Sequence, residues 1–235
     1  MGERFPLSLS AVNVVCFKLN WDEKALKVLL IKRNITPHKN KWSLPGGFVQ
    51  GNEKLEEAAV RIFGEETGIA PKYINQFRTY SDTGRDKRPV NKEKVRVITT
   101  SFIAIYTSSE EPVLTEESSD YEWFKVPRRY IQRSIPPLAF DHDQILLDAS
   151  NRLRINLEYQ GLATRFLSDY FTLGEIQDVY EIIWEVELDP ANFRDKLTNT
   201  DGWIKEVKNP PEAVSYTHLR AHETRHDLVC RLLLE

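Results

Sequence analysis

A Gly-Gly turn followed by an acidic, amphipathic segment constrains this chain more than any other feature. Residues 46–69 read GGFVQGNEKLEEAAVRIFGEETGI. Apolar residues recur there at three- and four-residue spacing, which predicts a helix from about residue 54 to residue 66 with one buried face. Gly68 stands where a left-handed residue commonly ends a helix. In the turn, Gly46 and Gly47 lack side chains, so their backbone N–H groups can approach a ligand phosphate.

Two adjacent carboxylates near the end of this helix indicate a cation site. Glu65 and Glu66 lie in the last turn, where the helix dipole disfavours negative charge. Carboxylates in such a place usually have a cationic partner, and Mg²⁺ prefers oxygen ligands. Arg61 precedes them by one turn and forms an i,i+4 pair with Glu57. For a lone Glu-Glu pair, a solvated acidic face is the alternative interpretation.

The complete spacing of this stretch resembles the Nudix box, G-x5-E-x7-R-E-U-x-E-E-x-G-U, in which U is aliphatic. The preceding residues Trp-Ser-Leu-Pro-Gly-Gly-Phe-Val are also similar to the family's lead-in. The resemblance covers roughly residues 8–127. It implies an α/β/α sandwich that cleaves nucleoside diphosphates linked to another moiety, with Mg²⁺ held by the box glutamates. The positions that match the box are Gly47, Glu53, Arg61, Glu65, Glu66, Gly68 and Ile69.

The chain departs from the box at Ile62, where the pattern has the first Glu of R-E-U-x-E-E. In the family that carboxylate is a metal ligand, and an aliphatic side chain can neither hold Mg²⁺ nor help to activate water. The remaining carboxylates of Glu53, Glu65 and Glu66 would bind Mg²⁺ more weakly than a complete box. If any hydrolysis remains, these three and Arg61 are its catalytic residues. We expect a retained fold and nucleotide site, with hydrolysis impaired or lost.

A polar loop at residues 81–89, SDTGRDKRP, lies between two strand-like runs at residues 74–80 and 95–106. Taken alone, it is equally compatible with a solvated hairpin connection. It is similar, however, to the Arg-Asp-x-Arg loop of Nudix proteins that handle ADP-ribose and of their regulator relatives. That resemblance implies that Arg85 and Arg88 clamp a pyrophosphate bidentately.

Residues 136–144, PPLAFDHDQ, mark a domain boundary. Asp141 is a suitable N-cap for a following helix. His142 between two aspartates is compatible with a metal cluster, but helix capping with His142 on the surface is the safer interpretation. The phrase LAFDHDxIL is very similar to the interdomain linker of Nudix-related transcriptional regulators, the NrtR-like group. The apolar residues expected on the linker helix are Ile145, Leu146, Ala149, Leu153 and Ile155.

A winged-helix layout follows the linker. Thr172 and Glu175 form a capping box for one helix, and Asp189 with Pro190 begins a second one. A strand is expected at residues 203–207. We therefore expect a Nudix-like sensing domain at residues 8–127, a linker helix at 128–159 and a winged helix at 160–213, with the helix at 189–199 as recognition helix. The expected DNA-contacting residues are Asn192, Arg194, Lys196, Asn199 and Lys205.

Charge argues partly against DNA as a partner. Residues 160–213 hold five Lys and Arg against eleven Asp and Glu, whereas a DNA-binding face normally carries a basic footprint. Compensation would come from a partner subunit or from arginines of the linker. Those arginines are Arg128, Arg129, Arg133, Arg152 and Arg154.

The last residues, 214–235, resemble a translated sequencing-adapter read-through and are expected to be non-native. In that case the second wing strand has been lost after about Ala213. His218, His222 and His226 stand at i, i+4 and i+8, which on a helix would suit zinc. Because the segment resembles an adapter scar, we reject a zinc site.

Composition bounds the remaining classes. The chain has 235 residues, 41% of them hydrophobic and 29% charged, with a net charge of −3 and two cysteines. These values describe an ordinary globular protein without a bulk polyanion partner and without a disulfide framework. The sequence has no apolar run of roughly 18 residues that would suggest a membrane span. We expect a soluble, cytoplasmic protein.

Two functions from different classes remain. The first is a homodimeric transcriptional regulator that senses an ADP-ribose-like nucleotide and leaves operator DNA when the nucleotide binds. Regulation of NAD metabolism and of sugar catabolism are both compatible with it. The alternative is a Mg²⁺-dependent hydrolase that cleaves ADP-ribose or nucleoside-diphosphate sugars. Ile62, the linker and the winged-helix layout favour the regulator.

Overall fold

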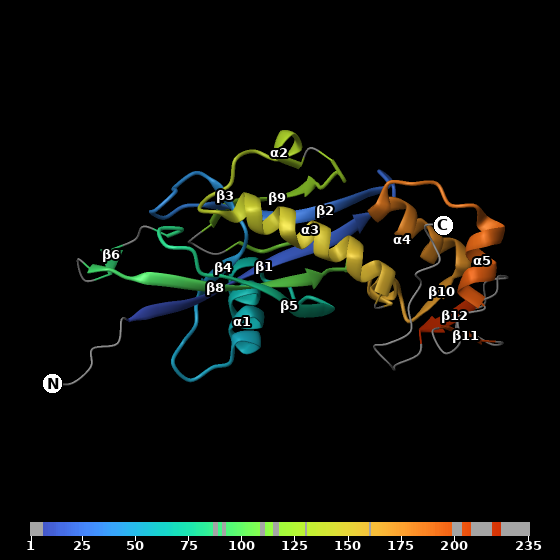
Figure 1. Cartoon of the computed structure of the whole chain (residues 1–235), viewed down its shortest axis with the longest axis horizontal. Helices are drawn as coiled ribbons and strands as arrows, with labels where there is room; N and C mark the ends of the chain where they lie inside the picture. The colour runs from blue at the N-terminus through green and yellow to red at the C-terminus, as the bar shows by residue number, and fades with distance from the viewer. Residues whose placement is uncertain are drawn as a thin grey trace.

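The computed structural model describes residues 7–86, 89–90, 93–108, 111–114, 118–129, 131–159, 161–198, 204–207 and 218–221. Figure 1 shows a central mixed sheet crossed by the long helix α3, with α1 on the other side of the sheet, and a smaller helical part at one end. No helix in the described ranges is long and apolar enough to cross a membrane.

The central sheet runs in the order β3-β2-β1-β8-β5, with β4 paired to β1 and β9 paired to β2. Strands β1 and β8 are parallel, and the other pairs are antiparallel. A separate short pair joins β6 (Pro89–Val90) to β7 (Glu93–Lys94). The strands of the central sheet are β1 (Ser8–Asn20), β2 (Ala25–Arg33), β3 (Trp42–Ser43), β4 (Gly46–Phe48), β5 (Tyr73–Tyr80), β8 (Arg96–Ile105) and β9 (Ser118–Lys125).

Side chains of β1 alternate between two separate cores, one on each face of the sheet. Val15 and Phe17 pack in a cluster with residues of α3 (His142–Tyr159). Val14 and Cys16 pack in a second cluster with residues of α1 (Leu55–Thr67). Because successive side chains of a strand point to opposite faces, one strand supplies both layers. The expected α/β/α sandwich is confirmed.

Helix α1 forms where the apolar spacing and the end signals predict it. Its first turn is closed by Glu57, whose carboxylate accepts a hydrogen bond from the backbone N–H of Lys54 at 2.9 Å. It ends at Gly68, which has φ 67° and donates its N–H to the carbonyl of Gly64. A left-handed residue is strained for any side chain with a Cβ, which explains the glycine there. The buried residues of the helix are Ala58, Ala59, Ile62, Phe63 and Thr67.

Helix α3 begins at His142, directly after Asp141, and its buried stripe is close to the expected one. Ile145, Leu146, Ala149 and Leu153 are buried. The expectation for Ile155 is wrong, since its side chain is 50% exposed. A period of 3.6 residues carries the buried face on to Leu157 instead.

The C-terminal part is a winged helix with the predicted end signals. The Thr172 hydroxyl accepts a hydrogen bond from the N–H of Glu175, and the Asp189 carboxylate accepts one from the N–H of Asn192 at 2.8 Å. Both caps satisfy N–H groups that a helix start leaves without partners. The elements of the winged helix are η1 (Leu162–Phe166), β10 (Tyr170–Thr172), α4 (Leu173–Trp184), α5 (Pro190–Thr198), β11 (Ile204–Val207) and β12 (His218–Ala221). The short helix α2 (Ile131–Ser134) lies before α3 in the chain.

A strand lies beyond Ala213, where we expect the native second wing strand to have been lost, so that loss stays a prediction. Strand β12 pairs antiparallel with both β10 and β11, which completes a small sheet in the order β10-β12-β11. His218 therefore lies on a strand and not on a helix, while His222 and His226 lie outside the described residues. That residues 214–235 are non-native stays a prediction.

The winged helix shares a continuous hydrophobic core with the α/β/α sandwich. One cluster of buried residues includes Phe17 of β1, Leu153 of α3, Ile183 of α4 and Phe193 of α5. Polar contacts add to it: the Tyr180 hydroxyl of α4 donates to a carbonyl of α3 at 3.2 Å. In Figure 1, α3 spans the sheet and reaches α4. Helix α3 therefore packs against both the central sheet and the C-terminal part.

Candidate functional site

Two of the box carboxylates, Glu53 and Glu65, accept hydrogen bonds from Arg61. Nε and Nη2 of Arg61 donate to the two oxygens of Glu53 at 2.8 and 2.5 Å, and Nη1 donates to Glu65 at 2.9 Å. Glu53 also accepts the N–H of Gln50 at 2.7 Å. The hydrogen bonds from Arg61, followed by the one from Gln50, lower the pKa of Glu53 to about 2. The same pairing raises the pKa of Arg61.

The third box carboxylate, Glu66, faces the Gly-Gly turn. Its Oε2 accepts the backbone N–H of Gly46 at 2.7 Å. A Cβ on Gly46 would lie 2.7 Å from the carbonyl oxygen of Val12, and one on Gly47 would lie 3.3 Å from Cδ1 of Ile62. Both glycines therefore have a packing role, because β4 approaches β1 and α1 closely. Their predicted role in holding a phosphate stays a prediction.

Ile62 lies in the apolar layer beneath this turn. Its side chain is 5% exposed and packs in the cluster that includes Val12, Phe63 and Ile69. The position that carries a metal ligand in the Nudix box has thus become part of the core. Among the described residues, no three His, Cys, Asp or Glu side chains come together in a way that would hold a metal. The donor set that remains around α1 fits Mg²⁺ only weakly.

Arg85 lies on the opposite face, at the start of α3. Its Nε and Nη2 donate to the two oxygens of Asp141 at 2.8 and 2.6 Å, and Nη1 donates to the Thr99 hydroxyl. The guanidinium stands 5.9 Å from the ring centroid of Tyr80, and its side chain is only 6% exposed. Its predicted companion Arg88 lies outside the described residues. The structure therefore places Arg85 against the interdomain linker.

The expectation of a surface His142 is wrong. The ring is 7% exposed, and Nδ1 accepts the backbone N–H of Leu44 at 2.9 Å. Burial, followed by the positive charges of the nearby Arg85 and Arg33, lowers the pKa of His142 to about 3. The sequence gives no sign that His142 is buried, because it stands between two aspartates. Only the fold packs the linker against Leu44, just before the Gly-Gly turn. His142 is neutral and acts as an acceptor at that contact.

Three buried polar residues beside Arg85 were not singled out from the sequence. Asn13, Thr99 and Ser101 are at most 4% exposed, and the Ser101 hydroxyl donates to Oδ1 of Asn13. By strand alternation they share the face of Val15 and Ile103, which is the α3 face. Their signal was available: each interrupts an apolar run in a strand. Of the three, Thr99 contacts Arg85 directly.

Helix α5 presents a polar surface over a buried base. Phe193 and Leu197 are buried, whereas Asn192 and Arg194 are exposed and Lys196 is half-buried. This division suits a recognition helix. Asn199 lies outside the described residues, and Lys205 lies on β11, where its side chain is not described.

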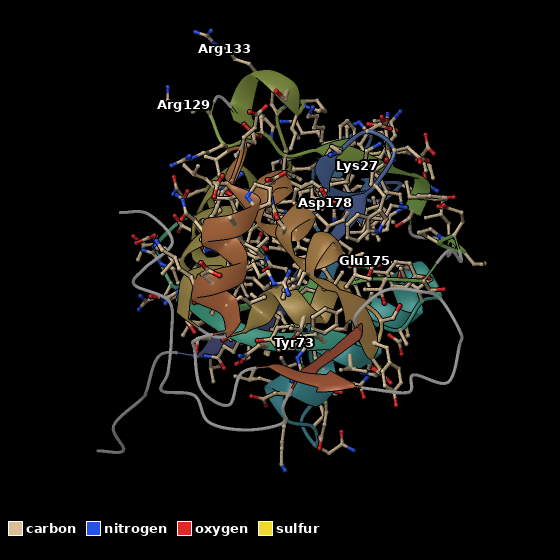
Figure 2. The ribbon with its side chains drawn as sticks, turned by 90° about the vertical axis from the view of Figure 1, so that its right-hand side faces the viewer. Lys27, Tyr73, Arg129, Arg133, Glu175 and Asp178 are labelled. Carbon is tan, nitrogen blue, oxygen red and sulfur yellow. The ribbon has the colours of Figure 1, made fainter. Side chains whose placement is uncertain are left out.

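The linker arginines divide into two groups. Nη1 of Arg128 donates to the carbonyl of Trp184 at 3.1 Å, and Nε of Arg154 donates to the carbonyl of Ile183 at 3.1 Å. These two therefore bind the C-terminal end of α4, where the helix dipole favours cations. Arg129, Arg133 and Arg152 are exposed, and Figure 2 shows Arg129 and Arg133 projecting away from the body around α2.

Two family models match the chain one after the other. The one described as NUDIX domain matches residues 9–147, more than half of the chain. The one described as NrtR DNA-binding winged helix domain matches residues 163–215.

Relatives with both kinds of printed function are similar to the chain. The ADPR responsive transcriptional repressor NtrR of Acinetobacter baylyi is 31% identical over 205 residues, 86% of this chain and 77% of that protein. The ADP-ribose pyrophosphatase of Methanocaldococcus jannaschii is 38% identical over 126 residues, 54% of this chain and 67% of that protein. The crystal structure of Shewanella oneidensis NrtR complexed with a 27mer DNA has a TM-score of 0.72 at 28% identity, over 92% of this chain and 94% of that chain.

Proposed function

This chain belongs to the NUDIX domain family, in the branch that carries an NrtR DNA-binding winged helix, and we propose that it is a transcriptional repressor that an ADP-ribose-like nucleotide releases from DNA. The observation that carries the proposal is that Ile62, at a position where the Nudix box has a metal ligand, is buried in the core. The same chain also carries a winged helix, which shares one hydrophobic core with the central sheet and α3. Such a protein acts on DNA, so we place it in the cytoplasm.

The nucleotide side of the proposal rests on the Nudix layer. We assign the pyrophosphate to Arg85 and Arg88, and another part of the nucleotide to the Gly-Gly turn at Gly46 and Gly47. A planar guanidinium with a fixed fork suits two phosphate oxygens at once. We assign sensing to residues 8–127 and the linker to residues 128–159.

The DNA side rests on residues 160–213. Helix α5 would enter the major groove and present Asn192, Arg194 and Lys196, followed by Asn199 and the wing residue Lys205. A two-fold homodimer would place two such helices on successive half-sites. Because the winged helix carries more Asp and Glu than Lys and Arg, exposed linker arginines would supply phosphate contacts, and binding would depend on salt.

Residual metal binding belongs to the same proposal. NUDIX family chemistry uses a divalent metal, and Glu53, Glu65 and Glu66 would hold Mg²⁺ weakly. When bound, the ion would neutralise phosphate charge on the nucleotide. Arg61 would keep Glu53 and Glu65 in place around it, as it does in the structure.

A specific observation keeps hydrolysis as a second candidate function. Glu53, Arg61, Glu65 and Glu66 all match the box, and the pyrophosphatase of Methanocaldococcus jannaschii is 38% identical over its matched part. Under this alternative the chain is a Mg²⁺-dependent ADP-ribose or nucleoside-diphosphate-sugar pyrophosphatase, and the winged helix is an accessory part.

One pair of measurements separates the two functions. Duplexes that the full chain selects from a random-sequence DNA pool are labelled, and their fluorescence anisotropy is followed while ADP-ribose is added. A repressor gives a specific complex that ADP-ribose dissociates, with AMP as the control nucleotide. In parallel, ADP-ribose is incubated with the chain and Mg²⁺. Release of AMP at about 1 s⁻¹ or faster, an ordinary enzymatic rate, would establish the hydrolase and overturn the repressor.

A further inference from the structure

The linker residue Asp141 forms an ion pair with Arg85, the arginine that we assign to the phosphate of the nucleotide. Both of its carboxylate oxygens accept from Arg85, at 2.8 and 2.6 Å. This bidentate geometry is the one that a guanidinium also uses for a phosphate. Arg85 cannot hold both anions with the same two N–H groups. A bound phosphate at Arg85 and the Asp141 contact therefore exclude each other.

The surroundings of Arg85 are within reach of the Gly-Gly turn. Ala11 of β1 pairs with Thr99 on one side and with Phe48 of β4 on the other. Two interstrand spacings separate the partner strands, which amounts to roughly 10 Å. Thr99 holds Arg85 through its hydroxyl. A nucleotide whose moieties are joined by a pyrophosphate is long enough to span this interval.

Asp141 is also the residue from which α3 starts, so its release changes the attachment of that helix. Helix α3 has 18 residues, about 27 Å of helix. Its far half holds α4 through Arg154, whose Nε donates to the Ile183 carbonyl and whose own carbonyl accepts from Trp184 Nε1 at 3.2 Å. Phe140, just before Asp141, has φ 54°, a strained conformation for a residue with a Cβ.

We propose that Asp141 is an internal competitor of the effector: an anionic phosphate of the nucleotide displaces its carboxylate from Arg85 and so loosens the N-terminal end of α3. This inference rests on the proposed function. Arg85 keeps an anionic partner throughout the exchange. Asp141 is already 26% exposed and becomes hydrated. The nucleotide thereby gains affinity only for the arrangement with a released α3, which is the differential affinity that a switch requires.

The test measures ADP-ribose binding by calorimetry and amide hydrogen exchange of residues 142–148, both on the full chain. In Asp141→Asn, the competitor is gone, so ADP-ribose should bind about fivefold tighter, and α3 should exchange faster without ligand. In Arg85→Gln, α3 should also exchange faster, but binding should weaken by about tenfold or more. A merely structural ion pair would shift both affinities in the same direction, and that result would overturn the proposal.

Asp148→Asn is the matched control on the same helix. Its carboxylate accepts from Arg78 at 2.7 Å and from the Tyr80 hydroxyl at 2.8 Å, without contact to Arg85. Helix exchange should rise, while ADP-ribose affinity should stay within about twofold, because Arg85 still faces its competitor. A gain in affinity equal to that of Asp141→Asn would show that general loosening is the cause and would overturn the proposal.

Two further measurements cover a variant that fails to fold. In the unaltered chain, ADP-ribose should itself accelerate exchange of residues 142–148, and slower exchange there would contradict the displacement. Asp141→Glu keeps the charge and should bind ADP-ribose as the unaltered chain does. If the unaltered chain does not bind ADP-ribose at all, the proposed function fails and the inference with it. If it binds and Asp141→Asn binds no tighter, only the inference fails.

Discussion

Replacing Ile62 by Glu restores the missing box carboxylate and tests how far this position has become core. Burying an isoleucine side chain stabilises a protein by about 1.5–3 kcal/mol. Because Ile62 is only 5% exposed, Ile62→Glu loses nearly all of this stabilisation. A Glu there stays neutral, and at pH 7 this costs at most about 3.7 kcal/mol against an ordinary pKa near 4.3. Relaxation toward the Gly-Gly turn lowers the total. We expect a destabilisation of about 4 kcal/mol at pH 7.

The pH dependence of this loss follows from the raised pKa. Between an ordinary carboxyl pKa and the raised one, the folded variant binds more protons than the unfolded chain, so its stability falls as pH rises. The destabilisation should therefore shrink to about 3 kcal/mol at pH 5. Ile62→Gln is the matched control: it has the same polar shape without a charge, and its destabilisation of about 2–3 kcal/mol should not change with pH.

Urea unfolding of the three proteins at pH 5 and pH 7 measures these differences. Added Mg²⁺ should stabilise Ile62→Glu more than the other two proteins, and that variant should hydrolyse ADP-ribose faster than the unaltered chain, because a metal ligand has been restored. Should Ile62→Glu unfold within about 0.5 kcal/mol of the unaltered chain at both pH values without metal, the side chain does not lie in the α1 core, and the reasoning is refuted.

Three further predictions concern the rest of the structure. Glu53 should titrate near pH 2 by NMR. The stabilisation of the folded state by its pair with Arg61 should be present above an ordinary Glu pKa and should be lost as the pH falls toward 2. Arg61→Lys should return the Glu53 pKa toward 4.5. Because the pKa of His142 is about 3 when folded, stability should fall as pH drops from about 6.5 toward 3. His142→Gln should remove that dependence in acid unfolding followed by fluorescence. Tyr180→Phe loses its hydrogen bond to α3 and should lower the unfolding free energy by about 1 kcal/mol.

The features that sequence reasoning predicted correctly are local ones. The spacing in α1, the stop at Gly68, the cap at Asp189 and the capping box at Thr172 each depend on residues within one or two helical turns. Interactions of that range are written in the order of residues along the chain. The winged-helix layout followed from those caps, together with the resemblance of the linker.

Apart from Ile155, whose exposure follows from local helical periodicity, the expectations that differed involve contacts between distant parts of the chain. His142 read as a surface residue, yet it accepts from Leu44, 98 positions away. Arg154 read as a basic surface residue, yet it binds the end of α4. Burial and pairing of this kind are set by which elements the fold brings together.

By itself, the sequence determined the Nudix layer, the winged helix and the loss of a box carboxylate at Ile62, because residue identity and spacing carry that chemistry directly. Only the tertiary structure decided that Ile62 packs under the Gly-Gly turn and that Asp141 holds Arg85 across 56 positions of chain. The physical reason is that an ion pair or a buried side chain needs a partner brought close in space. Sequence spacing alone does not specify such a partner.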